Sequence, residues 1–191
     1  NGTSCRADRE GCISIAAQWF GSTAAIVKKG NGRETTDSAA QNLVIPARPP
    51  RPTPAGVDAG APDGKGKLTG LTAGTAYEVS MDGGRTWESK TANGSGEITG
   101  LTPGSYIVHV KAGTSNFASV NSDVARIGAY QVKVTFKANG EDYRIVSVDY
   151  GGTLTGVPAV PTKKDAGDQI FAGEWCMDEQ GTTPAVFTNI T

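Results

Sequence analysis

The sequence predicts an all-β protein made of small sandwich-like modules, with very little helix. Leu68-Thr-Gly-Leu-Thr-Ala-Gly-Thr75 returns thirty residues later as Ile98-Thr-Gly-Leu-Thr-Pro-Gly-Ser105. Each copy leads into an aromatic-led segment, Tyr77–Ser80 or Tyr106–Val110, as expected of strands joined by tight turns. The composition agrees, because 26 Gly, 10 Pro and only 7% aromatic residues suit short strands and many turns. No long stretch carries apolar residues at helical spacing.

Charge and hydropathy limit the kinds of partner that the chain can have. The chain has 18 basic and 19 acidic residues, so it offers no electrostatic footprint for nucleic acid. No apolar run approaches the roughly 20 residues of a membrane span. Asn1-Gly-Thr-Ser4 has neither the basic nor the apolar region of a signal peptide. We therefore expect no nucleic-acid partner and no membrane insertion in this segment, and a sequence that begins inside a longer chain.

Residues 1–45 are predicted to be the closing strands of a preceding β module. Residues 12–20 alternate well enough for one strand and residues 24–28 for another, before a turn at Gly30-Asn-Gly32. The stretch Val27–Ile45 parallels Val110–Ile127: Gly30 matches Gly113 and Ile45 matches Ile127 at an offset of 82 to 83 residues, and Ser38 matches Ser119 or Ser122. A recurrence of this period indicates tandem modules.

Residues 46–54 are predicted to be a stiff spacer. Pro46-Ala-Arg-Pro-Pro-Arg-Pro-Thr-Pro54 has five prolines in nine residues, which favours an extended polyproline II segment. A proline-rich recognition ligand is the functional alternative.

Residues 55–128 form the predicted central sandwich. Because side chains alternate along a strand, Tyr106, Val108 and Val110 share one face, the expected core face, while Ile107 and His109 share the other. Asp82-Gly-Gly84 is the predicted turn between strands at residues 77–80 and 86–89.

Residues 129–191 form the last predicted module. Val132, Val134 and Phe136 alternate with Gln131, Lys133 and Thr135. After the Asn139-Gly140 turn, Val146, Val148 and Tyr150 alternate with Ile145, Ser147 and Asp149. After Gly151-Gly152 the chain crosses irregularly from Pro158 to Pro161. A short strand around Ile170–Trp175 and a segment around Ala185–Ile190 are expected to finish it.

The final module resembles the Listeria–Bacteroides repeat, the internalin-type B-repeat of secreted and wall-attached bacterial proteins. The matching pieces, in order, are Tyr130–Phe136, Val148–Gly152, Pro158–Lys163, Phe171–Gly173 with Trp175, and Ala185–Thr191. The resemblance implies a small β-grasp-like fold and a role in adhesion, display or spacing.

Two departures from the repeat pattern bear on that module. The loop Lys164–Gln169 is longer than in the family, and Glu174 separates the usual adjacent Gly and Trp. The chain also stops at Thr191, before the closing strand that normally ends in Ala-x-Trp. Residues 13–19 resemble that missing strand. This suggests that they complete the module, within one molecule or between neighbours, since an unpaired edge invites strand addition. Closing a preceding repeat is the alternative role for residues 13–19.

The central module, about Thr53 to Ile127, resembles the immunoglobulin-like or fibronectin type III-like repeats of Gram-positive surface proteins. Together the two resemblances imply an immunoglobulin-like sandwich followed by a β-grasp-like module. A likeness of architecture carries little information about function.

One hairpin matches the Asp-box pattern of sialidase propellers, in which the boxes lie away from catalysis. The matching residues are Ser80, Asp82, Gly84, Thr86 and Trp87. The Asp carboxylate can accept hydrogen bonds from turn amides, and the Gly takes a backbone angle that other residues resist. We interpret the motif as a structural turn.

Candidate binding and catalytic residues are few. Trp87 or Trp175 could stack on a sugar ring, although packing in the core or hairpin is the default for Trp in a small β domain. His109 lacks the Ser or Cys partner motif that catalysis needs. Cys5 and Cys12 are spaced to close a small loop, so a local disulfide and free thiols both stay open.

No metal or cofactor is expected. The three cysteines and single histidine supply a zinc site poorly. The carboxylate pairs lie in predicted turns and lack an EF-hand-like loop or a substrate cleft. These pairs are Glu141-Asp142, Asp165 with Asp168, and Asp178-Glu179.

We therefore expect a non-enzymatic segment of a bacterial cell-surface or secreted protein. It would act as a spacer or stalk and contribute adhesion to host or cell-wall glycans or to surface proteins, many weak contacts adding through avidity. The alternative is a carbohydrate-binding accessory module of a secreted glycan-acting enzyme, in which Trp87 or Trp175 binds the carbohydrate.

Overall fold

The computed structural model describes residues 4–138, 140–161, 174–178 and 183–191. It contains eleven β-strands that form antiparallel pairs in four sheets. The only helix in the described residues is one 3-10 turn, η1 (Ala17–Trp19). The predicted all-β class is therefore confirmed.

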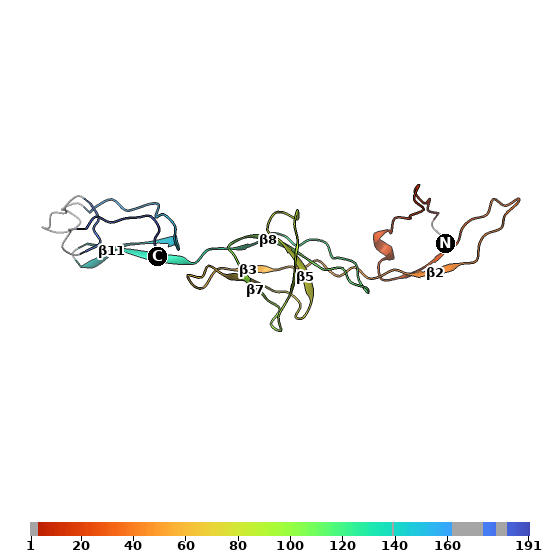
Figure 1. The fold of residues 1–191 in the computed structure, drawn as a ribbon, viewed down its shortest axis with the longest axis horizontal. Helices are drawn as coiled ribbons and strands as arrows, with labels where there is room; N and C mark the ends of the chain where they lie inside the picture. Colours follow the sequence, from red (N-terminus) through yellow and green to blue (C-terminus); the bar gives the residue numbers. More distant parts are fainter. Residues whose placement is uncertain (1–3, 139, 162–173, 179–182) are drawn as a thin grey trace.

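The chain is elongated, with three β sections following one another along its length (Figure 1). We call them the N-terminal section (residues 4–46), the central section (residues 47–128) and the C-terminal section (from residue 129). The N- and C-terminal sections lie at opposite ends, on either side of the central one. Sections that follow one another in sequence are thus neighbours in space.

The N-terminal section is a hairpin of β1 (Thr23–Ile26) and β2 (Gln41–Val44), preceded by η1. The expected strand over residues 12–20 is wrong, because the amides of Trp19 and Phe20 bond back to Ala16 and Ala17 and close a short helical turn. The predicted strand at 24–28 is present as β1. The N-terminal section, which holds residues 12–20, lies at the opposite end of the chain from the C-terminal section (Figure 1).

The central section consists of two sheets that share one core. One sheet has the order β3 (Ala55–Val57), β4 (Gly66–Thr69), β7 (Ile98–Leu101). The other has the order β6 (Glu88–Thr91), β5 (Ala76–Ser80), β8 (Gly104–Val110), β9 (Ala125–Ile127). Apolar residues of both sheets and their adjoining turns are buried in a single cluster: Leu68, Leu71, Tyr77, Val79, Ala92, Ile98, Leu101, Tyr106, Val108, Ala125 and Ile127. The period-two prediction for Tyr106 and Val108 is confirmed.

The repeated Thr-Gly-Leu-Thr motif builds equivalent corners of this core. Its leucines, Leu71 and Leu101, are both buried. The following tyrosines are buried too, but their hydroxyls act in opposite senses. Tyr77 Oη accepts a hydrogen bond from the Thr72 amide at 3.0 Å, whereas Tyr106 Oη donates to the Thr102 carbonyl at 2.6 Å. Each hydroxyl thereby ties a strand to the turn before it.

Serine hydroxyls fasten the loop after β8 onto that strand. Val108 and Val110 donate their amides to the Oγ atoms of Ser122 and Ser119, at 3.0 and 2.8 Å. The amides of the two serines bond to the carbonyls of the same valines. Lys28 and Ser38 in the N-terminal section make the same reciprocal pair, at 3.0 Å in both directions. The sequence parallel between the two segments is thus matched in their hydrogen bonding.

The C-terminal section is organised around the hairpin of β10 (Gln131–Ala138) and β11 (Glu141–Asp149), with a register shift between Phe136 and Lys137. Its core holds Phe136, Val148 and Leu154, with the partly buried residues Val132, Val134, Val146, Trp175, Phe187 and Ile190 packed against it. The predicted strand around Ile170–Trp175 lies mostly outside the described residues, and Trp175 itself is in no strand. The predicted loop 164–169 also lies outside them.

Candidate functional site

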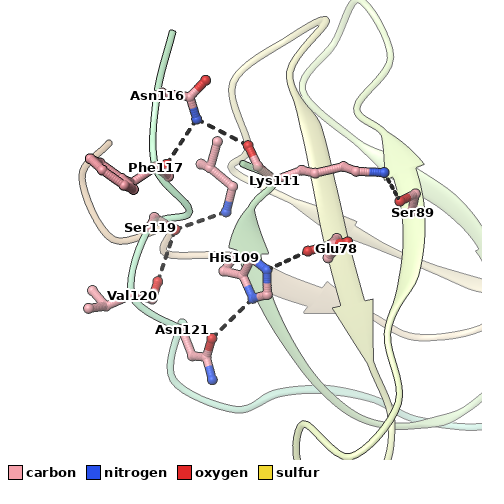
Figure 2. A network of polar contacts seen from close by, with 10 residues as sticks. Glu78, Ser89, His109, Lys111, Asn116, Phe117, Ser119, Val120 and Asn121 are labelled. Atoms are coloured by element: carbon pink, nitrogen blue, oxygen red, sulfur yellow. Dashed lines mark hydrogen bonds and ion pairs between the residues drawn. The ribbon is translucent and has the colours of Figure 1, made fainter. Parts of the chain in front are cut away.

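Polar and aromatic side chains gather on the outer face of the four-stranded sheet, opposite the core. We call Glu78, Trp87, Ser89, Ile107, His109, Lys111 and Asn121 the outer-face cluster. Glu78 and His109 are cross-strand partners, and Ser89 lies opposite Glu78 on the other side. Figure 2 shows the polar part of the cluster, with His109 between Glu78 and Asn121 and with Lys111 reaching across to Ser89. Three neighbouring strands and one loop therefore supply it.

The Asp-box hairpin fixes one end of the cluster. The Asp82 carboxylate accepts hydrogen bonds from the amides of Arg85 and Thr86 at 3.0 and 2.9 Å, and from the Thr86 hydroxyl at 2.6 Å. Ser80 Oγ donates to Asp82 at 2.7 Å and accepts from the Gly84 amide at 2.9 Å. These bonds, led by the one from Thr86, hold the pKa of Asp82 well below its usual value. The motif works as a turn, through the contacts expected from its residue types.

Trp87 follows directly from that turn and lies partly exposed on the sheet. Its ring centroid is 4.3 Å from that of His109. A Cβ on Gly84 would lie 3.2 Å from the Trp87 ring, and Gly84 has φ +91°, so this position suits glycine on both counts. Within the described residues the indole N–H makes no hydrogen bond, and no buried side-chain nitrogen or oxygen there lacks a partner, so this N–H is not fully buried.

His109 is engaged at both ring nitrogens. Nε2 lies 2.8 Å from Glu78 Oε2, and Nδ1 lies 3.1 Å from Asn121 Oδ1. The His109 side chain is mostly buried beneath these partners and Trp87. It therefore serves as a rigid support within the cluster.

Lys111 is the cation of the cluster. Its Nζ donates to Ser89 Oγ at 2.6 Å, which lays the side chain across β5 (Figure 2). Among the described residues it has no carboxylate partner, whereas Glu78 is paired with His109. The cluster thus holds, with Trp87, a cation that has no ion-pair partner in the described residues.

The serine-fastened loop places Asn121. Ser119 and Ser122 hold the loop against β8 on either side of it, and the Arg51 Nε donates to the Asn121 carbonyl at 2.7 Å. Asn121 is exposed, and its Oδ1 is the atom turned toward His109. Its amide nitrogen makes no hydrogen bond in the part of the chain that the structure describes.

Trp175, the other proposed sugar-stacking residue, lies in different surroundings. Its ring contacts Phe136 at 4.8 Å and Tyr143 at 5.8 Å between centroids, and its Nε1 donates to the Pro158 carbonyl at 2.8 Å. The indole packs against the C-terminal core with its polar atom satisfied. The two tryptophans therefore do not share a face.

The remaining candidates do not gather around the cluster. Cys5 and Cys12 are exposed free thiols on either side of a turn held by Asp8, and Cys176 is a partly buried free thiol. Asp142 faces Lys137 at 3.7 Å, and Asp178 accepts the Thr183 amide at 2.8 Å. Asp165, Asp168 and Glu179 lie outside the described residues.

Residues 4–138, 140–161, 174–178 and 183–191 contain no group of three or more His, Cys, Asp or Glu side chains that could hold a metal ion. Nor do they contain a helix long and apolar enough to cross a membrane.

Sequence reasoning placed His109 on its strand, β8, and placed Trp87 on the strand that it in fact precedes, β6, but it missed that the two side chains touch. Period-two alternation would have put Glu78 and His109 on the outer face once β5 and β8 were paired. Lys111 and Asn121 carried no such signal, because a loop hydrogen-bonded through serine side chains brings Asn121 to the sheet. Comparison with protein-family models and with curated proteins finds no match to this chain.

Proposed function

We propose that the chain is a non-enzymatic spacer segment of a bacterial cell-surface or secreted protein, which extends other parts of that protein by folded modules held in line. The observation that carries the proposal is the serial arrangement of the three sections (Figure 1). The bacterial surface location rests on the resemblances of the central and C-terminal modules to surface-protein repeats.

The joint between the N-terminal and central sections supports a stiff connection. Phe20 and Phe117 meet edge to face at 5.2 Å, and the Arg48 guanidinium lies 4.6 Å from the Phe20 ring centroid. Phe117 donates its amide to the Ala47 carbonyl at 2.9 Å. A joint with aromatic, cation–π and backbone contacts resists bending more than a bare linker does.

The proline-rich segment contributes to the same joint. Ala47 forms a parallel bridge with Asn116, and Arg51 pairs with Asp123 at 2.5 Å. Pro52 is buried. The segment thus lies along the central section, which supports a spacer that is braced as well as extended.

The second joint, between the central and C-terminal sections, is short. Gly128 donates its amide to Asp58 Oδ1 at 2.6 Å, and the Ala59 amide bonds to the Gly128 carbonyl at 3.1 Å. β10 begins at Gln131. So few intervening residues leave little slack between the central and C-terminal sections.

We propose further that the central module is immunoglobulin-like and that the C-terminal module is β-grasp-like. A three-stranded sheet β3-β4-β7 facing a four-stranded sheet β6-β5-β8-β9 supports an immunoglobulin-like or fibronectin type III-like central module. The bond from Tyr106 Oη back to the Thr102 carbonyl supports it further, since such tyrosine corners mark these sandwiches. The β-grasp-like assignment of residues 129–191 rests on the sequence resemblance.

Small-angle X-ray scattering tests the spacer proposal. A compact globule of 191 residues would have a radius of gyration of about 16 Å. Three touching globules in line, each a third of the chain, give about 25 Å by the same scaling. We expect a value near the larger figure, and a value near the smaller one would reject the proposal.

Variants at the first joint extend this test. Phe117→Ala combined with Arg51→Ala should broaden the distribution of interatomic distances, because the ring contact and the ion pair are lost together. Arg126→Ala, an exposed change on β9 away from the joint, is the matched control and should leave the scattering unchanged. Equal scattering from the joint variant and the control would show that these contacts do not set the stiffness.

A further inference from the structure

We propose that the outer-face cluster is a binding site for a carboxylate-bearing saccharide. In this site the Trp87 indole stacks on the sugar ring and Lys111 meets the carboxylate. The site goes beyond the spacer role and does not depend on it, because a stalk module can be stiff with or without a ligand.

The indole of Trp87 has the properties of a stacking platform. Saccharide rings have an apolar face edged by hydroxyls, so they suit an aromatic ring whose polar atom can still bond. Trp87 is partly exposed and its N–H has no hydrogen-bond partner in the described residues, whereas the N–H of Trp175 is already used by Pro158. Among these two candidates, Trp87 alone keeps a donor for a ligand.

The platform is held in place before a ligand arrives. His109 packs against the Trp87 ring and is itself fixed by Glu78 and Asn121. The hydrogen bonds around Asp82 set the hairpin that carries Trp87. Side chains that are already ordered lose less conformational entropy on binding, which favours affinity from a small contact area.

Further polar groups lie around the same ring. Asn121 presents its exposed carboxamide, which has donor and acceptor atoms, from the loop side. Ser89 of β6 is the cross-strand neighbour of Glu78, and its hydroxyl accepts a hydrogen bond from Lys111. Donors spaced across a sheet face around one aromatic ring suit a ligand with several hydroxyls.

The charges of this face select the class of saccharide. Lys111 has no carboxylate partner among the described residues, while Glu78 is held by His109 and Asp82 by its own turn. The Lys111 ammonium is therefore free to pair with a carboxylate that a ligand brings. An anionic sugar such as a uronic acid complements it better than a neutral one.

Nuclear magnetic resonance of the whole chain tests the site directly. The protein has three tryptophans and so three indole N–H signals, and Trp87→Phe identifies the one from Trp87 by its loss. Hyaluronan hexasaccharide, with a carboxylate on alternate sugars, is the acidic probe, and chitohexaose is its neutral counterpart. We expect saturable movement of the Trp87 signal with the acidic probe, and unmoved signals from Trp19 and Trp175.

Variants separate the two parts of the proposal. Trp87→Ala should weaken binding of the acidic probe about tenfold, the upper range for one aromatic contact. Lys111→Gln leaves the fold intact and should weaken it about two- to fivefold, as for an exposed charge pair, without changing binding of the neutral probe. Lys133→Gln, an exposed lysine in the C-terminal section, is the matched control and should change neither.

Three results would overturn the assignment. If the Trp87 signal does not move with up to about 10 mM of either probe, the face binds no such saccharide. If the two probes bind equally and Lys111→Gln has no effect, the carboxylate class is wrong. If the Trp175 or Trp19 signal moves instead, the site lies elsewhere.

Discussion

Replacing Leu68 by Ala should destabilise the central section selectively. Leu68 lies on β4 and is 0% exposed, at the centre of the cluster shared by the two sheets. A Leu→Ala change at such a position costs about 2–5 kcal/mol, from the lost transfer free energy and the cavity left behind. For a domain of this size, about 1 kcal/mol corresponds to 4–8 °C, so the melting temperature of this section should fall by at least about 8 °C.

The tryptophans make the assay specific to each section. Trp19, Trp87 and Trp175 lie in the N-terminal, central and C-terminal sections respectively, and the chain has no others. Variants that keep one Trp and replace the other two by Phe report the unfolding of one section at a time by fluorescence. Leu68→Ala should shift the transition seen by Trp87 and leave the one seen by Trp175 in place.

Leu43→Ala is the matched control for this substitution. Leu43 lies on β2 and is 44% exposed, so its truncation should cost less than about 1 kcal/mol. The reasoning is refuted if Leu68→Ala costs no more than the control. It is also refuted if the Trp175 transition shifts as far as that of Trp87, because the sections would then unfold as one unit.

Three more predictions concern the central section, each followed by the Trp87 fluorescence transition. The depressed pKa of Asp82, caused first by its bond from Thr86, means that its charged form stabilises the fold above the unfolded pKa, near 3.9, and that this contribution is lost as pH falls below it. Asp82→Asn should therefore be less stable than the wild type at pH 7, and the difference should shrink below about pH 4; a constant difference would contradict this. Tyr106→Phe removes the donor to the Thr102 carbonyl and should cost about 1 kcal/mol, which an unchanged denaturation midpoint would disprove. Gly96→Ala should be far more damaging than Gly100→Ala. Both have positive φ, but only at Gly96 would the new Cβ meet a backbone oxygen, at 2.2 Å, so similar losses from the two would speak against the close contact.

The predictable parts of the fold were those set by local pattern. Alternation identified Tyr106 and Val108 as core residues, and the Asp-box residue types predicted the hydrogen bonds around Asp82. Asp82-Gly-Gly84 and the turn at Gly140 marked the two hairpins, with positive φ at Gly83, Gly84 and Gly140. In each case the information lies within a few neighbouring residues.

The failures came where a longer-range partner decides. Residues 12–20 alternate like a strand, but among the described residues no neighbouring strand pairs with them, and local amide bonds of Trp19 and Phe20 take over. The site was predictable only in part. Trp87 was identified as a candidate, yet its contact with His109 depends on how β5 pairs with both β6 and β8.

The serine fastening of β8 also affects how the molecule avoids self-association. β9 pairs with only the first part of β8, residues 104–106, and the amides of Val108 and Val110 would otherwise form an open strand edge. Such an edge is a template for pairing with another chain and for amyloid growth. Ser119 and Ser122 occupy those amides and carbonyls with a loop that cannot extend the ladder. These two hydroxyls thereby block strand addition at this edge, and Lys28 and Ser38 make the same pair just beyond the end of β1.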